Sequence, residues 1–393
     1  MVLRSRGENE LIPQYSLTGD LLSYLRCGLQ YRYHNGSSLP PSRPVQLWFG
    51  EFIHGVLEGA FRIWSNNSPP PLFPWPCNPT PFRGQVPPGR LFNDLGIIGD
   101  TVEASLRAQG KNPRSATVRD SAYQRADCAI NELGPHLFPL IAQAEERVIG
   151  TRQIPASPTG SSTGSRANLY ELHGIIDVVT NLQLTGAPDS NVIKTLIQNA
   201  NPGLEGNFEV IVEYKGSRRP AMTHPYWQQG DWQVQTYAWL RMRQAVSLPV
   251  VAGILVYINE LAPTSEDIRK LKRDIQNGDT DIIPLHGSMD AYNLNAWRQG
   301  DAVPNLSFDF RIARALRVIP VTSASQQTAS AEFDQVVRQI ENCVAAEAAA
   351  GRIIQNWGTG GDDDTCTACD FRHFCPDPSP RTGTHNITAP NAP

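Results

Sequence analysis

Lysine is scarce in this chain. Only five of its 34 basic residues are lysines: Lys111, Lys194, Lys215, Lys270 and Lys272. The 34 basic residues are outnumbered by 38 acidic residues, so the formal net charge is −4. This charge excludes a globally basic binder of polyanions. Any polyanion contact must therefore come from a local patch or a bound metal. The bias toward arginine suits phosphate contacts, although genomic base composition explains it equally well.

Long hydrophobic runs are also absent. No stretch approaches the roughly 20 apolar residues that span a bilayer, and the opening MVLRSRGENELIPQYS lacks the apolar core of a secretory signal. The cysteines number seven, at Cys27, Cys77, Cys128, Cys343, Cys366, Cys369 and Cys375. We therefore expect a cytoplasmic protein with no membrane partner, whose clustered thiols do something other than form disulfides.

The hydrophobic pattern predicts a mixed α/β fold. Helical spacing covers residues 17–33, 46–64, 115–144 and 224–245, and 332–351 reads as another helix. Apolar runs typical of strands cover 145–154, 169–184, 210–212 and 250–259. The residues 185–206 read as a polar connection. This order, with three strands in a meander, then a helix and a further strand, predicts a mixed β-sheet flanked by helices.

One strand ends in Glu213-Tyr214-Lys215. Strand side chains alternate, so Glu213 and Lys215 project to the same face. Such a triplet alone is usually a solvated surface pair. Asp177 lies in a β-branched run, where a carboxylate is costly unless it is paired or bound to metal. Neighbouring strands lie about 4.8 Å apart, close enough for Asp177 and Glu213 to share one ion.

His54 lies on or beside the apolar stripe of residues 46–64. A lone helix histidine is more often a satisfied core residue than a ligand. With Asp177 and Glu213, however, His54 completes a site for Mg²⁺ or Mn²⁺, which would lower the pKa of a bound water. Lys215 would orient that water or neutralise charge that grows in the transition state.

Gln233 and Tyr237 lie four residues apart on the helix that follows this strand, so they share a face. They either support Lys215 and touch the DNA backbone, or form an ordinary amphipathic face, and the sequence leaves both interpretations open. Arg218 and Arg219 either meet phosphates or form a solvated charge pair.

Cys366, Cys369 and Cys375 lie within ten residues, which is a strong metal-binding signal in a chain without a secretory signal. Three thiolates need a fourth ligand. Either His373 closes a Cys₃His zinc site, or a distant cysteine completes an iron–sulfur cluster.

Taken together, these residues resemble the iron–sulfur group of the RecB-like PD-(D/E)XK nucleases. That group includes the AddB nuclease domain, the CRISPR-associated adaptation nucleases and eukaryotic exonuclease V. The matching residues, in chain order, are Cys27, His54, Gly174 with Asp177, Glu213 with Lys215, Gln233 with Tyr237, and the three C-terminal cysteines.

The resemblance implies a restriction-endonuclease-like fold and a Mg²⁺- or Mn²⁺-dependent exonuclease acting on single-stranded DNA ends. It also implies a structural 4Fe–4S cluster with Cys27 as the fourth ligand, and a further acidic residue at Glu146. A helicase, CRISPR-adaptation or replication protein is the expected partner, in DNA repair or antiviral defence. An endonuclease or RNase of the same fold and a non-enzymatic, cluster-bearing nucleic-acid-binding module are the alternatives.

The resemblance also sets the expected organisation. Residues 1–144 form an N-terminal helical region that carries Cys27 and His54, and residues 145–262 form the nuclease core. Residues 263–375 form a helical and cysteine-cluster region that packs back on the N-terminus. Residues 376–393, rich in Pro, Thr and Asn, are expected to be disordered.

Overall fold

The structure of the chain is a computed structural model. It describes residues 12–36, 45–77, 92–154, 167–182, 184, 186–351, 354, 356–361, 365–366, 369–372 and 375–376. His373, most of the Ser/Thr/Gly-rich residues 155–167 and the C-terminal residues 377–393 lie outside these ranges, so the expectations for them remain predictions.

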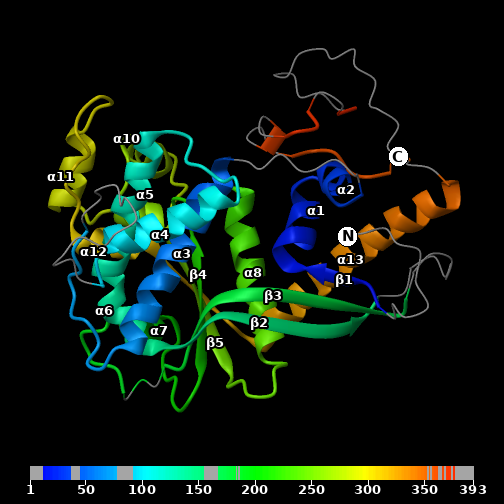
Figure 1. Cartoon of the computed structure of the whole chain (residues 1–393), viewed down its shortest axis with the longest axis horizontal. Helices are drawn as coiled ribbons and strands as arrows, with labels where there is room; N and C mark the ends of the chain where they lie inside the picture. Colours follow the sequence, from blue (N-terminus) through cyan, green and yellow to red (C-terminus); the bar gives the residue numbers. More distant parts are fainter. Residues whose placement is uncertain are drawn as a thin grey trace.

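Six strands form one mixed sheet (Figure 1). They are β1 (Gln14–Ser16), β2 (Ile141–Gln153), β3 (Leu169–Thr180), β4 (Glu209–Lys215), β5 (Val250–Tyr257) and β6 (Leu316–Pro320). The order is β1-β3-β4-β5-β6, and β2 pairs with β3. The β2, β3 and β4 strands are antiparallel neighbours, β4 and β5 are parallel, and β6 is antiparallel to β5. The predicted mixed sheet and its meander are confirmed, whereas β1 and β6 were not predicted.

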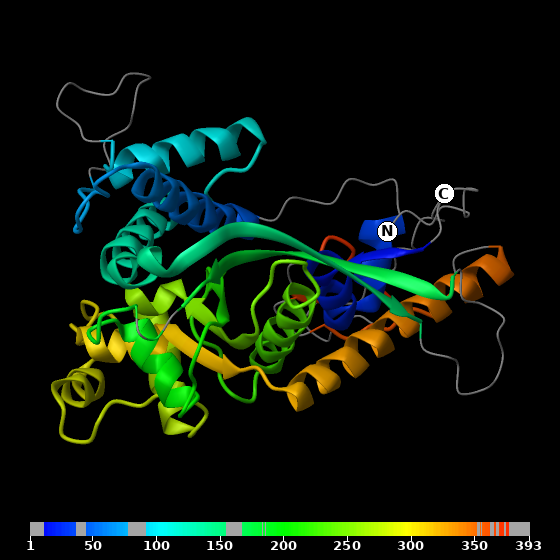
Figure 2. The same ribbon diagram turned by 90° about the horizontal axis from the view of Figure 1, so that it is seen from below.

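Helices cover both faces of this sheet. One apolar cluster joins the sheet to α3 (Val45–Asn66), α4 (Leu95–Ala108), α5 (Ala116–Cys128), α6 (Gly134–Leu137), α7 (Val192–Ala200) and α12 (Phe308–Ala315). A second cluster joins it to α1 (Leu22–Arg26), α2 (Gly28–Gly36), α8 (Pro225–Arg241) and α13 (Ser323–Ala350). Figure 2 shows α13 running along the extended β2–β3 pair. The first cluster also includes α9 (Ile258–Leu261), and two further described helices are α10 (Ser265–Gln276) and α11 (Met289–Ala296).

The central strand β4 is buried on both of its faces. Val210 and Val212 belong to the first cluster and Ile211 to the second, as strand alternation requires. A strand covered by helices on both faces reads as a continuous apolar run. By the same alternation, Glu213 and Lys215 project to the face of Ile211, which α8 covers.

The predicted single helix over residues 17–33 is interrupted. A π-helical turn, η1 (Leu17–Leu21), leads into α1, and Cys27 is extended before α2 begins. The C-terminal segment meets the chain at this break, where the Leu29 amide donates to the Gly358 carbonyl at 2.9 Å. An interrupted helix exposes backbone groups, and a neighbouring segment here satisfies one of them.

Three other expectations needed correction. The first long strand begins at Ile141, within residues assigned to helix, because its pairing with Thr180 outweighs local propensity. The polar connection 185–206 contains α7, capped by the Asn191 side chain. The C-terminal helix α13 begins at Ser323 rather than near 332.

We expect Gly253→Ala to destabilise the fold. A methyl group at Gly253 on β5 would lie 2.2 Å from Cγ1 of Val234 on α8. Such overpacking typically costs about 1–3 kcal/mol. Urea unfolding measures the loss. Gly50→Ala on α3 is the matched control, because its methyl group would meet no described atom within 4 Å. Equal unfolding free energies for the two variants would contradict the close packing of α8 on β5.

Candidate metal centre

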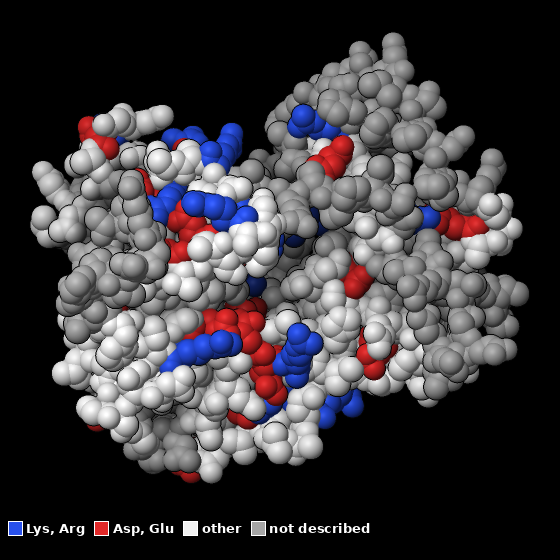
Figure 3. Space-filling view, in the orientation of Figure 1, with Lys and Arg blue, Asp and Glu red and all other residues white. Residues whose placement is uncertain are grey.

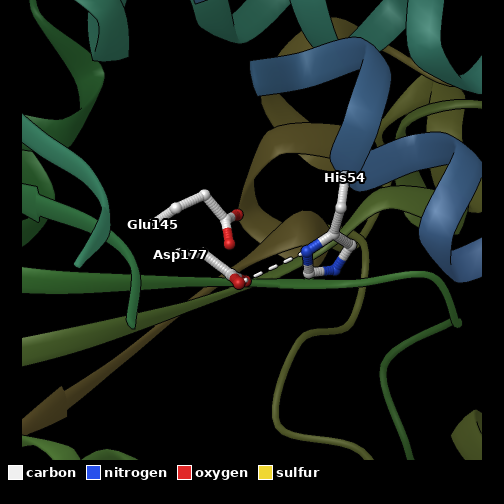
Figure 4. Close-up of side chains that lie close together, drawn as sticks. All are labelled: His54, Glu145 and Asp177. Carbon is white, nitrogen blue, oxygen red and sulfur yellow. Dashed lines mark ion pairs between the residues drawn. The ribbon is translucent and has the colours of Figure 1, made fainter. Parts of the chain in front are cut away.

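His54 and Asp177 form the first part of the centre. His54 projects from α3 toward β3, and its Nδ1 lies 3.3 Å from Oδ1 of Asp177 (Figure 4). The other Asp177 oxygen, Oδ2, accepts a hydrogen bond from the Tyr214 amide at 2.7 Å. The backbone of β4 therefore fixes the buried Asp177 carboxylate, which keeps one oxygen directed at the imidazole.

Glu145 is the third member. The ligand atoms of His54, Glu145 and Asp177 all lie within 4.8 Å of one another. Glu145 lies on β2 between Ala144 and Glu146, whose partners on β3 flank Asp177. Its φ of 53° is a conformation that residues with a Cβ rarely adopt. Strained backbone of this kind concentrates at functional sites.

Glu146 is not the acidic residue of this centre, contrary to the sequence expectation. Its Oε1 lies 3.4 Å from Nη1 of Arg241, which itself holds Glu209. The left-handed backbone at Glu145 disturbs the simple alternation of β2, so the two adjacent glutamates could not be told apart from the sequence. The strand register, together with this backbone conformation, brings Glu145 beside Asp177.

Lys215, Gln233 and Glu213 form a second, adjoining group. The Lys215 ammonium donates to Oε1 of Gln233 at 2.6 Å, and Nε2 of Gln233 donates to Oε2 of Glu213 at 3.1 Å. Lys215 Nζ lies 3.8 Å from the same Glu213 oxygen. The Gln233 amide therefore bridges the acid and the amine and fixes their separation.

Tyr237 packs behind this group. A Cβ at Gly174 would lie 2.5 Å from Cε1 of Tyr237, so the ring rests against β3 where the strand has no side chain. Burial raises the pKa of Tyr237 well above its usual value, and the charges of Glu213 and Asp177 raise it further. Tyr237 and Gln233 are both buried, so they act on neighbouring side chains inside the protein.

The side chains fit a hard divalent cation. Glu213 is 3% exposed, and its Oε1 has no hydrogen-bond partner among the described residues. Burial raises the pKa of Glu213 well above its usual value, and the Asp177 charge adds to this against the opposing effect of Lys215. A buried carboxylate oxygen without a partner, beside a second carboxylate, is what an oxygen-seeking cation would stabilise.

The nearby charges also shift the pKa values of Glu145 and His54. Partial desolvation and the Asp177 charge raise the pKa of Glu145. Burial by itself lowers the pKa of His54, but the facing Asp177 carboxylate outweighs this effect and the pKa lies above its usual value. The group carries excess negative charge, as expected for a cation site.

The C-terminal cysteines approach the N-terminal helices. Burial raises the pKa of the Cys369 thiol, and the nearby Cys27 and Cys375 raise it further. The Cys369 amide donates to the Cys366 carbonyl at 3.3 Å. The Phe371 ring lies 4.7 Å from that of Tyr33 on α2. Figure 1 shows the C-terminal segment, in red, beside α2.

No disulfide joins Cys27, Cys366, Cys369 and Cys375 in the described part of the chain. In the described part of the chain, the His54 group is the one whose ligand atoms meet within 4.8 Å, and the four sulfurs do not converge to that spacing. The structure thus brings Cys27 to the C-terminal cysteines without defining a metal geometry there.

A mixed sheet whose meander carries two carboxylates and a lysine beside a helix histidine is the arrangement of a restriction-endonuclease-like, metal-dependent nuclease. The model of the PD-(D/E)XK nuclease superfamily matches residues 19–376. The chain therefore belongs to the PD-(D/E)XK nuclease superfamily, whose members use Mg²⁺ or Mn²⁺.

Other comparisons add little. No curated protein matches the chain significantly. Among solved structures, one described as "Crystal structure of SSO0001" is 13% identical, covering 70% of this chain and 81% of that one with a TM-score of 0.25. Within the described residues, no helix is long and apolar enough to cross a membrane.

Glu145→Gln should weaken Mn²⁺ binding by about tenfold or more, because even partners one step removed from a metal commonly contribute 10–100-fold to affinity. Calorimetric titration measures the change. Glu146→Gln is the matched control. It removes a charge one residue away, from a carboxylate that pairs with Arg241 instead. An equal loss in both variants would rule out Glu145 as a specific ligand.

Proposed function

We propose that this protein is a deoxyribonuclease that hydrolyses single-stranded DNA from its ends. His54, Glu145, Asp177 and Glu213 hold Mg²⁺ or Mn²⁺. The observation that carries the proposal is the meeting of His54, Glu145 and Asp177 within 4.8 Å, beside the group that holds Lys215. Superfamily membership supports a metal-dependent nuclease. The preference for single-stranded ends rests on the ordered resemblance to the RecB-like group.

When bound, a divalent cation supplies a Lewis acid for the scissile phosphate and lowers the pKa of a coordinated water. Among the protein side chains, Lys215 provides the positive charge that faces the substrate. Its ammonium is anchored by Gln233 at 2.6 Å yet is about one-quarter exposed, so it also faces solvent. From there it neutralises charge that builds on the phosphate oxygens. Asp177, fixed by the Tyr214 amide, and His54 keep the ligand set in place.

Gln233 and Tyr237 are positioning residues. Gln233 holds Lys215 and Glu213 apart at a fixed distance, and Tyr237 fills the space over Gly174. Gln233 is 5% exposed and Tyr237 is 2% exposed, so both act mainly through the side chains that they contact.

Lys215→Ala and Asp177→Ala should each reduce Mn²⁺-dependent degradation of end-labelled single-stranded DNA by about 10²-fold or more, as expected when a group that stabilises transition-state charge is lost. Circular dichroism verifies folding. Lys111→Ala is the control, since Lys111 pairs with Glu51 outside the centre. It should retain activity.

Parallel reactions with double-stranded DNA and RNA separate the alternatives. Products that shorten stepwise from an end indicate an exonuclease, and internal fragments indicate an endonuclease. Faster loss of RNA would identify an RNase. Wild type that binds strands without shortening them would reject catalysis and leave a binding module.

We also propose that Cys27, Cys366, Cys369 and Cys375 hold a structural 4Fe–4S cluster. The approach of Cys27 and Cys375 to Cys369 supports it. The competing assignment is zinc on the three C-terminal cysteines and His373.

Anaerobically purified protein should be brown and contain about four iron and four sulfide per chain. Cys27→Ser should lose the colour and melt at a lower temperature. Cys128→Ser changes a thiol on α5, within the other helical layer, and should stay brown. Colourless wild-type protein with one zinc would reject the cluster.

A further inference from the structure

A cavity of about 710 Å³ opens beside Lys215. One wall comes from η1 and α1, through Thr18, Leu22 and Arg26, and the opposite wall comes from the segment after β4 and from α10. Lys215 and Gln233 also line it, so the cavity adjoins the proposed catalytic group without including the His54 ligands. Figure 3 shows this face of the molecule hollowed near its centre, with basic side chains inside the hollow.

The lining is basic in a chain that is acidic overall. Besides Lys215, it includes Arg26, Arg218, Lys270 and Arg273, and no Asp or Glu is among the described residues that line it. Exposed phosphate-binding sites combine such side chains along a groove. The cavity is therefore the local basic patch that a protein of net charge −4 needs to hold a polyanion.

Arg218 shares its acidic partner, Asp274, with Arg273, so the basic lining is not fully neutralised. Its Nη2 donates to Asp274 at 2.6 Å, while its Nη1 is buried with no hydrogen-bond partner among the described residues. A buried guanidinium nitrogen without an acceptor costs free energy.

Two aromatic rings lie at the N-terminus of α8. The His224 and Tyr226 rings both line the cavity, with centroids 4.7 Å apart and planes at 51°. His224 caps the helix by accepting the Tyr226 amide hydrogen bond at 3.2 Å, which fixes the pair. Tyr226 is 41% exposed and so keeps surface available to a ligand. Aromatic rings stack on unpaired bases and tolerate any sequence.

We propose that this cavity binds one unpaired strand of nucleic acid next to the scissile phosphate. Arg26, Arg218 and Arg273 hold backbone phosphates, and Tyr226 stacks on a base. The volume lies in the range of about 300–1,000 Å³ that suits a small ligand, so it admits a short stretch of one strand and excludes a duplex. The link to Lys215 rests on the proposed nuclease function, whereas the binding itself does not.

The test is fluorescence anisotropy of a labelled single-stranded oligodeoxynucleotide in Ca²⁺, with strand integrity checked on gels. Tyr226→Ala should weaken binding by about tenfold. Arg273→Gln should reduce the slope of log affinity against log salt by about 0.7, the loss of one phosphate contact on a single strand. A matching oligoribonucleotide and a blunt duplex form the other arms, and the duplex should bind more weakly than either strand.

Matched controls lie outside the cavity. Arg269→Gln removes an equally charged, exposed residue from α10, and Tyr292→Ala removes an exposed tyrosine from α11. Neither lines the cavity. Both variants should bind as wild type does.

Hydrolysis in Mn²⁺, measured in parallel, separates the two proposals. Wild type that degrades DNA while Tyr226→Ala and Arg273→Gln bind normally would overturn the cavity assignment and leave the nuclease. Variants that lose binding in a protein without hydrolysis would overturn the nuclease and support the cavity. Duplex binding that equals single-strand binding, with no effect of Tyr226→Ala, would also overturn the inference.

Discussion

Carboxylates crowd together where the pairing of β3 and β4 ends, and this crowding constrains the rest of the structure. Asp177 and Glu213 are buried, and Glu145 faces them from β2. Ionised groups removed from water are costly unless they are paired, hydrogen-bonded or bound to metal. The Tyr214 amide and the Gln233 side chain offset part of this cost. Oε1 of Glu213 remains without a hydrogen-bond partner in the described region, so the negative charge of the buried carboxylates is not fully compensated by the protein.

The sheet topology explains why the side chains of α8 lie against the buried carboxylates. The β4 and β5 strands are parallel, so a crossover must join them, and α8 is that crossover. It packs on the face to which Glu213 and Lys215 project. Gln233 and Tyr237 therefore reach the strand residues as a consequence of chain connectivity. Gly174 completes the arrangement, because a larger residue would collide with the Tyr237 ring.

Candidate site residues could be predicted from the sequence where a local feature of the chain marks them. Glu213 and Lys215 follow from strand alternation, Asp177 from a charge inside an apolar run, and His54 from a strong helix stripe. Glu145 could not be distinguished from Glu146, because the choice depends on β-strand register and on a left-handed backbone. The break at Cys27 was equally hidden, since a contact with Gly358, far along the chain, accompanies it.

The same break links the described N-terminal helices and the described C-terminal segment to the cavity beside Lys215. The five residues of α1 are too few for a stable helix in isolation, so packing must hold its position. Tyr24 meets the Trp357 ring, with centroids 6.2 Å apart, and Trp357 donates to Glu347 on α13. Arg26 lines the cavity and directly precedes Cys27. Whatever fixes Cys27 to the C-terminal cysteines therefore also fixes one wall of the cavity, so the proposed cluster would affect the proposed strand binding by holding that wall in place.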